Sequence, residues 1–261
     1  MHPYKKVEMI KLYSLLFLCG TLGLSGNSFP VFHAGMIRIK DIPLPEGYKR
    51  MITSSHSFAD YLQNLPLRKD KTVYLYNKQP KPNQSLHYAV IDISTGERDL
   101  QQCADAIMRL RAEYFFEKKQ YDSIRFPKGD RTYYQYATYT TGDKNNRQSF
   151  LHFMEQVFIN CGTYTLEQQL KPVLHFEDLQ IGDVFIKAGA PGHAEIVADM
   201  AVNDVTGKKI YLLAEGYMPA QDIHILLNPV NPTLGPWYEV NGQKEVVTAS
   251  WIFMSNQLRH W

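Results

Sequence analysis

The sequence predicts an α+β fold in which a helix that carries a cysteine packs on a C-terminal antiparallel sheet. Residues 99–119 (DLQQCADAIMRLRAEYFFEKK) repeat their apolar side chains at the spacing of an amphipathic helix. From residue 183 onward, short apolar segments alternate with turns, which is the pattern of antiparallel strands. Because no linker-like stretch separates the two regions, we expect a single domain over residues 27–261.

Ahead of the long helix, the sequence predicts a short helix and a pair of strands. Residues 55–65 have the helical spacing of apolar side chains, with Ser55 or Ser57 as the N-cap. The segments 72–76 (TVYLY) and 86–93 (LHYAVIDI) are the expected strands, and a polar loop joins them.

The long helix is expected to begin at Asp99, which is a suitable N-cap. After it, residues 130–147 are polar and rich in tyrosine, and they predict a loop or loose hairpin. Residues 148–160 predict another helix, which Gly162 ends, and a short helix is expected at 165–170. The apolar face of the long helix contains Cys103, Ala106, Ile107, Leu110 and Tyr114.

The C-terminal strands predict a hairpin. Residues 193–202 (HAEIVADMAV) and 208–217 (KKIYLLAEGY) flank a turn, so paired residue numbers are expected to sum to about 408–411. His193 then lies opposite or diagonal to Glu215, and alternation along the strands places both side chains on one face. Asp199 lies roughly 20 Å further along its strand, at about 3.3 Å per residue, and is excluded from any contact with His193.

Composition excludes several classes of protein. Hydrophobic residues make up 44% of the chain and the mean hydropathy is −0.32, which excludes a polytopic membrane protein. The formal charge of +2 is spread along the chain, so we expect no nucleic-acid partner. No metal-ligand spacing and no glycine-rich phosphate loop occurs in the sequence, so we expect no metal and no cofactor.

The N-terminus predicts export. A basic stretch at residues 5–11 precedes an uncharged apolar run at 12–24, which is the pattern of a secretory signal peptide covering residues 1–26. The protein is therefore expected in the periplasm or cell envelope, and it would touch the membrane only through this signal or through a lipid anchor on Cys19. Removal of the signal leaves equal numbers of basic and acidic side chains.

Cys103 and Cys161 are the cysteines that remain after the signal. Cys103 lies near the start of the long helix, where unpaired N–H groups stabilise a thiolate. His193 opens a strand directly after a glycine turn, a position that suits a general base. Glu215 would accept a hydrogen bond from the imidazole and orient it. A Cys103–Cys161 disulfide or a buried core cysteine are the alternatives to this catalytic interpretation.

Other residues give weaker signals. Trp237 and Tyr238 follow Pro236 and would stack on a sugar ring or pack in the core. His224 is expected to be a strand histidine without a role.

Several segments carry a resemblance to a known family: DLQQCADAIMRLRAEYFF, IGDVFIKAGAPGHAEIVAD and LLAEGYMPAQDIHIL, with SFADYLQNLPL and GPWY in support. From about residue 37 to 258, the sequence resembles the bacterial family catalogued as domain of unknown function 4846. This resemblance implies an exported or envelope protein whose activity is not established.

A more distant resemblance is to papain-like cell-wall amidohydrolases of the CHAP and NlpC type. It implies a papain-like core, with Cys103 as the nucleophile, His193 as the base and Glu215 as the orienting residue. The backbone N–H of Cys103, helped by Gln102, would stabilise the oxyanion. The implied function is cleavage of amide bonds in cell-wall peptides. The alternative is a non-catalytic envelope module that binds glycan or peptide, with Trp237 and Tyr238 in its binding surface.

Overall fold

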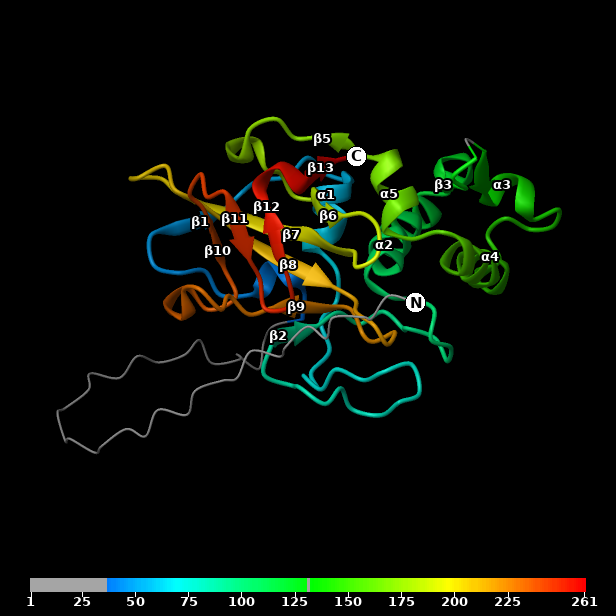
Figure 1. Cartoon of the computed structure of the whole chain (residues 1–261), viewed down its shortest axis with the longest axis horizontal. Helices are drawn as coiled ribbons and strands as arrows, with labels where there is room; N and C mark the ends of the chain where they lie inside the picture. Colours follow the sequence, from blue (N-terminus) through cyan, green and yellow to red (C-terminus); the bar gives the residue numbers. More distant parts are fainter. Residues whose placement is uncertain (1–36, 131) are drawn as a thin grey trace, which may run out of the picture.

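The computed structural model describes residues 37–130 and 132–261. In this part of the chain, a nine-stranded antiparallel sheet has the order β2-β9-β8-β7-β6-β13-β5, with β1 paired to β7 and β10 paired to β8. Helices α2–α5 gather at one end of the sheet, and β10 and β11 lie at the other (Figure 1). The expected α+β class, with a large antiparallel sheet, is confirmed.

The helices and strands have the following bounds. The helices are α1 Phe58–Gln63, α2 Cys103–Glu117, α3 Tyr136–Tyr139, α4 Arg147–Asn160 and α5 Thr163–Gln169. The strands are β1 Tyr48–Arg50, β2 His87–Val90, β3 Arg125–Pro127, β4 Tyr133–Gln135, β5 Lys171–Pro172, β6 Val184–Lys187, β7 His193–Asn203, β8 Lys209–Glu215, β9 His224–Leu226, β10 Tyr238–Val240, β11 Glu245–Val247, β12 Ile252–Met254 and β13 Leu258–His260.

The β7–β8 hairpin has the predicted register. Ile196 pairs with Ala214, and beyond a bulge Val202 pairs with Lys209, so the sums of paired numbers fall inside the expected range. Asp199 is buried at the far end of this strand, where it binds Arg50 and Gln63. It therefore takes no part in the surroundings of His193.

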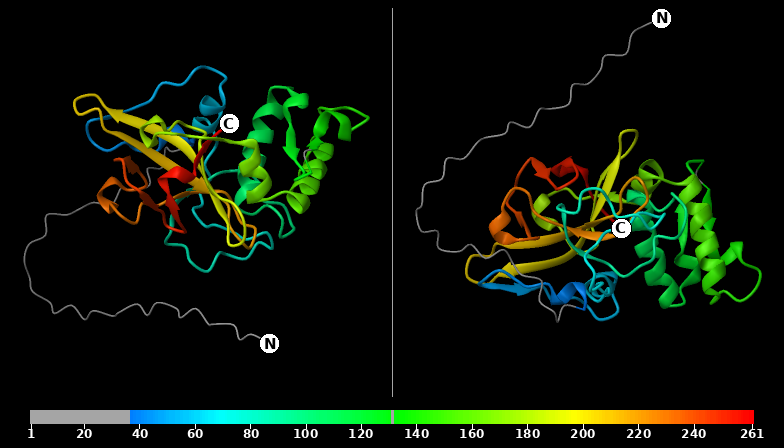
Figure 2. Two further views of the ribbon diagram at one scale, coloured as in Figure 1. Left: turned by 45° about the horizontal axis from the view of Figure 1, so that its top comes forward. Right: turned by 90° about the horizontal axis from the view of Figure 1, so that it is seen from below.

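Alternation along β7 and β8 builds an apolar core on each face of the sheet. Ile196 and Leu212 face the core formed with α1 and α2. Val197 and Leu213 face the second core, which the β11–β12 hairpin covers. The right-hand view of Figure 2 shows the N-terminal segment (blue) and the C-terminal segment (red) on opposite faces of these strands.

Several local expectations need correction. The N-cap of α2 is Gln102 rather than Asp99, because the carboxylate of Asp105 closes a capping box at that turn. Residues 72–76 form only isolated bridges, since a residue of the loop and a residue near β9 pair with them. Gly162 is the N-cap of α5, and Cys161 is the residue that ends α4.

The polar, tyrosine-rich stretch at residues 130–147 contains a short strand and a short helix. Its residues 133–135 form β4, which pairs with β3, and its residues 136–139 form α3. The sequence predicts a loop or a loose hairpin within residues 130–147, whereas in the structure the first strand of the hairpin, β3, precedes this stretch and one turn of helix follows β4.

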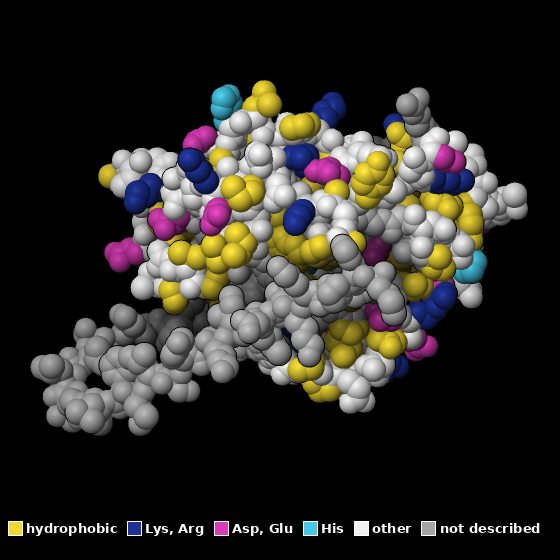
Figure 3. Space-filling model, viewed as in Figure 1, with side chains coloured by type: hydrophobic (Ala, Val, Ile, Leu, Met, Phe, Trp, Pro, Cys, Tyr) yellow, Lys and Arg dark blue, Asp and Glu magenta, His cyan; other side chains and the backbone are white. Residues whose placement is uncertain are grey.

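Figure 3 shows one surface of the molecule, on which basic and acidic side chains are interspersed. No helix within residues 37–130 and 132–261 combines the length and the apolar character needed to cross a bilayer. The predicted signal peptide 1–26 and Cys19 lie outside the described residues.

Candidate active site

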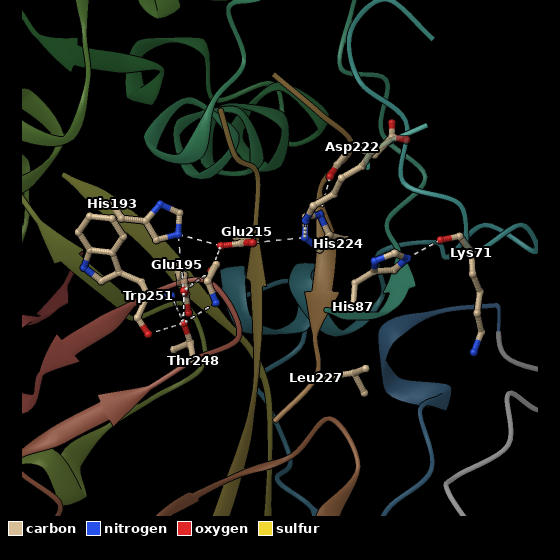
Figure 4. A network of polar contacts seen from close by, with 12 residues as sticks. Lys71, His87, His193, Glu195, Glu215, Asp222, His224, Leu227, Thr248 and Trp251 are labelled. Carbon is tan, nitrogen blue, oxygen red and sulfur yellow. Dashed lines mark hydrogen bonds and ion pairs between the residues drawn. The ribbon is translucent and has the colours of Figure 1, made fainter. Parts of the chain in front are cut away.

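The β7–β8 hairpin brings His193 and Glu215 into contact. In this register Glu215 is diagonal to His193, and alternation places both side chains on the face toward the β11–β12 hairpin. Nε2 of His193 lies 2.7 Å from Oε2 of Glu215 (Figure 4). Glu195, two residues along β7, is further away, with its Oε1 at 3.5 Å from the same nitrogen. All three side chains are buried.

The start of α2 lies against the end of β8. A Cβ on Gly216 would lie 3.0 Å from the carbonyl oxygen of Gln102 and 2.9 Å from Cβ of Ala106. Only a residue without a side chain therefore allows the strand end to approach the first turn of the helix this closely. This contact brings Cys103, the first residue of α2, to the imidazole at the start of β7.

Cys103 and His193 line the same cleft, and the thiol is close enough to influence the pKa of the imidazole. Because Glu215 occupies Nε2, the other ring nitrogen, Nδ1, is the one left for the thiol. Burial disfavours the charged imidazole, but hydrogen bonds with Cys103, Glu195 and Glu215 outweigh it and raise the pKa of His193 to about 12. The ring is therefore an imidazolium over the ordinary pH range, placed between a thiol and a carboxylate.

The two glutamates differ in their electrostatics. Burial works against ionisation of Glu215, but hydrogen bonds from His193 and His224 outweigh it and lower the pKa of this carboxyl. Burial is also the largest influence on Glu195, and there it prevails and raises the pKa. Glu215 is therefore the charged partner of the imidazolium.

Aromatic rings surround the imidazole. The centroid of the Trp251 ring lies 5.3 Å from that of the His193 ring, and the centroid of the Tyr217 ring lies 5.1 Å from it. These rings exclude water from the His193–Glu215 hydrogen bond, which strengthens it. Sequence reasoning missed both residues, because no local spacing connects positions 217 and 251 with a histidine at 193.

Cys103 and His193 open into a cleft with a volume of about 640 Å³. Its walls come from the start of α2, the α4–α5 junction, the 189–192 turn and the Tyr217–Met218 segment, and Trp251 also lines it. Gly192, directly before His193, is closely packed, since a Cβ there would lie 2.3 Å from the carbonyl oxygen of Gly189. The turn thus holds the histidine at the edge of the cleft.

Gln102 lines the cleft, and its backbone N–H and one hydrogen of its side-chain amide are engaged in hydrogen bonds. Its backbone N–H donates to Asp105, and its side-chain amide donates to Oδ1 of Asp99 at 3.2 Å. The N–H of Cys103 is the first of α2 and has no acceptor within the helix. The two oxyanion donors expected from the sequence therefore both have a hydrogen left, the backbone N–H of Cys103 and the second hydrogen of the Gln102 amide.

Both described cysteines are free thiols. Cys161 lies on the cleft wall with Sγ 3.4 Å from the carbonyl oxygen of Pro127. Burial raises the pKa of the Cys161 thiol to about 11. The Cys103–Cys161 disulfide considered from the sequence is not formed.

Trp237 and Tyr238 do not lie in the cleft. Both are buried in the apolar cores, where Nε1 of Trp237 donates to the carbonyl of Pro43 and the Tyr238 hydroxyl donates to that of Leu227. The stacking surface considered from the sequence is thus not available. These rings pack, because each has a satisfied polar atom and apolar neighbours.

His224 has a position that the sequence did not suggest. It is fully buried, and its Nε2 lies 3.3 Å from Oε1 of Glu215 (Figure 4). Its Nδ1 is 2.8 Å from the carbonyl oxygen of Asp222 and donates to it. Glu215 therefore has an imidazole at each carboxylate oxygen, and His224 is part of the site.

His193, Glu195 and Glu215 also place donor atoms within 4.8 Å of one another, a spacing that a divalent cation could use. In this structure the same atoms are joined by hydrogen bonds, and the hydroxyls of Thr248 and Ser250 bind the carboxylates as well.

Comparison with known proteins places the chain in a family. The family model described as domain of unknown function 4846 matches residues 39–260. The chain belongs to this family. The match covers α2 and the whole β7–β8 hairpin, so the cluster around His193 lies within the family domain. Neither curated proteins nor solved structures gave a match to the chain.

Proposed function

We propose that this member of the domain of unknown function 4846 family is a papain-like cysteine hydrolase that cleaves amide bonds. The observation that carries the proposal is the continuous series of contacts from Cys103 through His193 to Glu215 at the edge of a cleft. A nucleophile beside a base, with the base held by a third group, is the arrangement that nucleophilic catalysis needs.

The reaction follows from these positions. The Cys103 thiolate attacks the carbonyl carbon, and the Cys103 N–H stabilises the oxyanion. The C–N bond then breaks, and the His193 imidazolium gives its proton to the leaving amine. Water attacks the thioester while His193 accepts a proton, and the C–S bond breaks to release a carboxylic acid. Glu215 holds the ring through both steps.

We propose cell-wall peptides as the substrate. The support is the export expected from residues 1–26 and the resemblance of the Cys103, His193 and Glu215 segments to CHAP and NlpC amidohydrolases. The cleft, at about 640 Å³, has room for part of a peptide, and aromatic and aliphatic side chains line it. The rival proposal is a non-catalytic envelope module, which would bind peptide or glycan in the same cleft.

The experiment is digestion of purified cell wall by residues 27–261, followed by mass spectrometry of the soluble products. The account predicts a new amine and a new carboxyl group at one type of amide bond, and no product with Cys103→Ala. Cys161→Ala is the matched control and is expected to retain the activity. Products from Cys103→Ala would contradict the proposal, as would loss of the wild-type activity in EDTA, which would favour a bound cation.

A further inference from the structure

We propose that Ser250 is a positioning residue for the His193–Glu215 pair. Its hydroxyl fixes the Glu215 carboxylate in the orientation that binds the imidazole, and the turn at residues 248–251 fixes the hydroxyl. The hydrogen-bonding role of Ser250 stands by itself, whereas its consequence for the reactivity of Cys103 rests on the proposed function.

The first observation is a single carboxylate oxygen with two hydrogen-bond partners. Oε2 of Glu215 lies 2.7 Å from Nε2 of His193 and 2.6 Å from the hydroxyl oxygen of Ser250. Two oxygens come this close when a hydrogen lies between them. Because Glu215 is the ionised partner of the imidazolium, that hydrogen belongs to the serine. The same hydroxyl lies 3.2 Å from Oε1 of Glu195, which is the longer of its two carboxylate contacts.

The other oxygen of Glu215 has a longer contact. Oε1 lies 3.3 Å from Nε2 of His224, further than either partner of Oε2. The terminal bond of a glutamate side chain turns over a broad range, so the contacts of one oxygen decide where both oxygens point. Ser250 and His193 therefore together set the plane of the carboxylate.

Backbone and side-chain hydrogen bonds hold the turn that carries Ser250. The Thr248 N–H donates to the Trp251 carbonyl at 2.8 Å, and the Trp251 N–H donates to the Thr248 hydroxyl oxygen at 3.0 Å. The Thr248 hydroxyl in turn lies 2.7 Å from Oε1 of Glu195. The turn is therefore bound to β7 through Thr248 and to β8 through Ser250.

The sheet register places the two glutamates next to each other. Ile196 pairs with Ala214, so Glu195 and Glu215 are neighbours across β7 and β8. One turn can therefore supply a hydroxyl to each carboxyl group.

Ser250 acts through Glu215 rather than on a substrate. Trp251 is one of the described residues that line the cleft, whereas Ser250 is not. A hydrogen bond to an ionised carboxylate stabilises that form, so Ser250 favours the shared proton on Nε2 of His193 over Oε2 of Glu215. The neutral imidazole then has its electron pair at Nδ1, the nitrogen left for Cys103.

Proton NMR of protein that contains ¹⁵N-labelled histidine tests the positioning role. The Nε2–H signal of His193 is identified by its loss in His193→Gln. In Ser250→Ala, this proton is expected to exchange with water about tenfold faster, because the carboxylate is no longer held against it. Ser250→Thr keeps the hydroxyl and is expected to restore the wild-type exchange rate.

Ser255→Ala is the matched control, since Ser255 directly follows β12 and its loss should leave the signal unchanged. Ser250→Gly is a second variant without the hydroxyl and is expected to behave like Ser250→Ala. Wild-type exchange in Ser250→Ala, or equal exchange in the Thr and Ala variants, would overturn the proposal.

Alkylation of Cys103 by iodoacetamide at about pH 6 tests the consequence for reactivity. Ser250→Ala is expected to slow it about tenfold, because an imidazolium held less firmly stabilises the thiolate less. Native circular dichroism is the check on folding, and Ser250→Thr should restore the rate. Unchanged alkylation in Ser250→Ala would overturn this consequence.

The NMR measurement needs no activity, so it separates this proposal from the proposed function. Faster exchange in Ser250→Ala, with no product from cell wall, would support the positioning role and contradict the hydrolase. Wild-type exchange in Ser250→Ala, with hydrolysis by the wild-type protein, would do the reverse.

Discussion

His193 lies between the Cys103 thiol and the Glu215 carboxylate. One nitrogen binds Glu215 and the other is left for Cys103, while Trp251 and Tyr217 cover the ring. A His–Glu pair that is almost fully buried gains its strength from this exclusion of water. Its charge state therefore depends on Glu215 more than on the solvent.

Glu215 provides a prediction at this scale. Glu215→Gln keeps an acceptor for the imidazole but removes the negative charge, so the pKa of His193 is expected to fall from about 12 toward its ordinary value near 6.5. The basic limb of the pH–rate profile should move to lower pH. Glu215→Leu removes the acceptor too and should lose on the order of 10²–10⁴ in rate.

The control is Glu97→Gln, since the Glu97 carboxylate is exposed and lies 3.5 Å from Nζ of Lys78 on the surface. Its profile should match that of the wild type. If Glu215→Gln and Glu215→Leu have the same rates and the same profile, Glu215 does not orient the imidazole.

Ionisation of Glu215 also affects the stability of the fold in acid. Because the pKa of Glu215 is lowered in the folded protein, its ionised form contributes stability above the unfolded pKa of about 4.3. That contribution is lost as the pH falls below this value through the folded pKa, so acid weakens the β7–β8 hairpin at the site.

At the scale of elements, the long helix and the hairpin were predictable because both depend on local patterns. Apolar spacing identified α2, and the turn between β7 and β8 fixed the diagonal contact of His193 and Glu215. The N-cap of α2 was missed, because the choice between Asp99 and Gln102 depends on which carboxylate closes the first turn. His224 and Trp251 were missed because they reach the site only through tertiary packing.

Gly216 provides a prediction at this scale. In Gly216→Ala the new Cβ would lie 3.0 Å from the Gln102 carbonyl oxygen and 2.9 Å from Cβ of Ala106, so β8 and α2 must separate. We expect a loss of about 1–3 kcal/mol in the free energy of unfolding, measured by urea denaturation. Because the separation displaces Cys103 from His193, turnover should fall by up to about 10²-fold. Gly142→Ala is the matched control, since nothing lies within 4 Å of its added Cβ.

At the scale of the whole molecule, the site is assembled from segments far apart in the sequence. Cys103 comes from the first helix turn beside the sheet, His193 and Glu215 from its central hairpin, and Trp251 from the segment between β11 and β12. The family domain of residues 39–260 includes all of them. The same cleft also contains Cys161, a second thiol in a different chemical environment.

The proposal that Cys103 is the nucleophile can be tested by comparing the reactivities of Cys103 and Cys161 in a single sample. Native protein is treated with iodoacetamide at about pH 6, and the labelled cysteines are identified by peptide mass spectrometry. An ordinary thiol, with a pKa near 8.5, is almost entirely protonated at this pH, so only a thiolate held by an imidazolium reacts readily. Cys161 is the internal control, because burial raises the pKa of its thiol to about 11. The account predicts rapid labelling of Cys103, none of Cys161, and loss of the Cys103 reaction in His193→Gln. A Cys103 that reacts only after denaturation, or only as fast as Cys161, would contradict the account and favour the binding module.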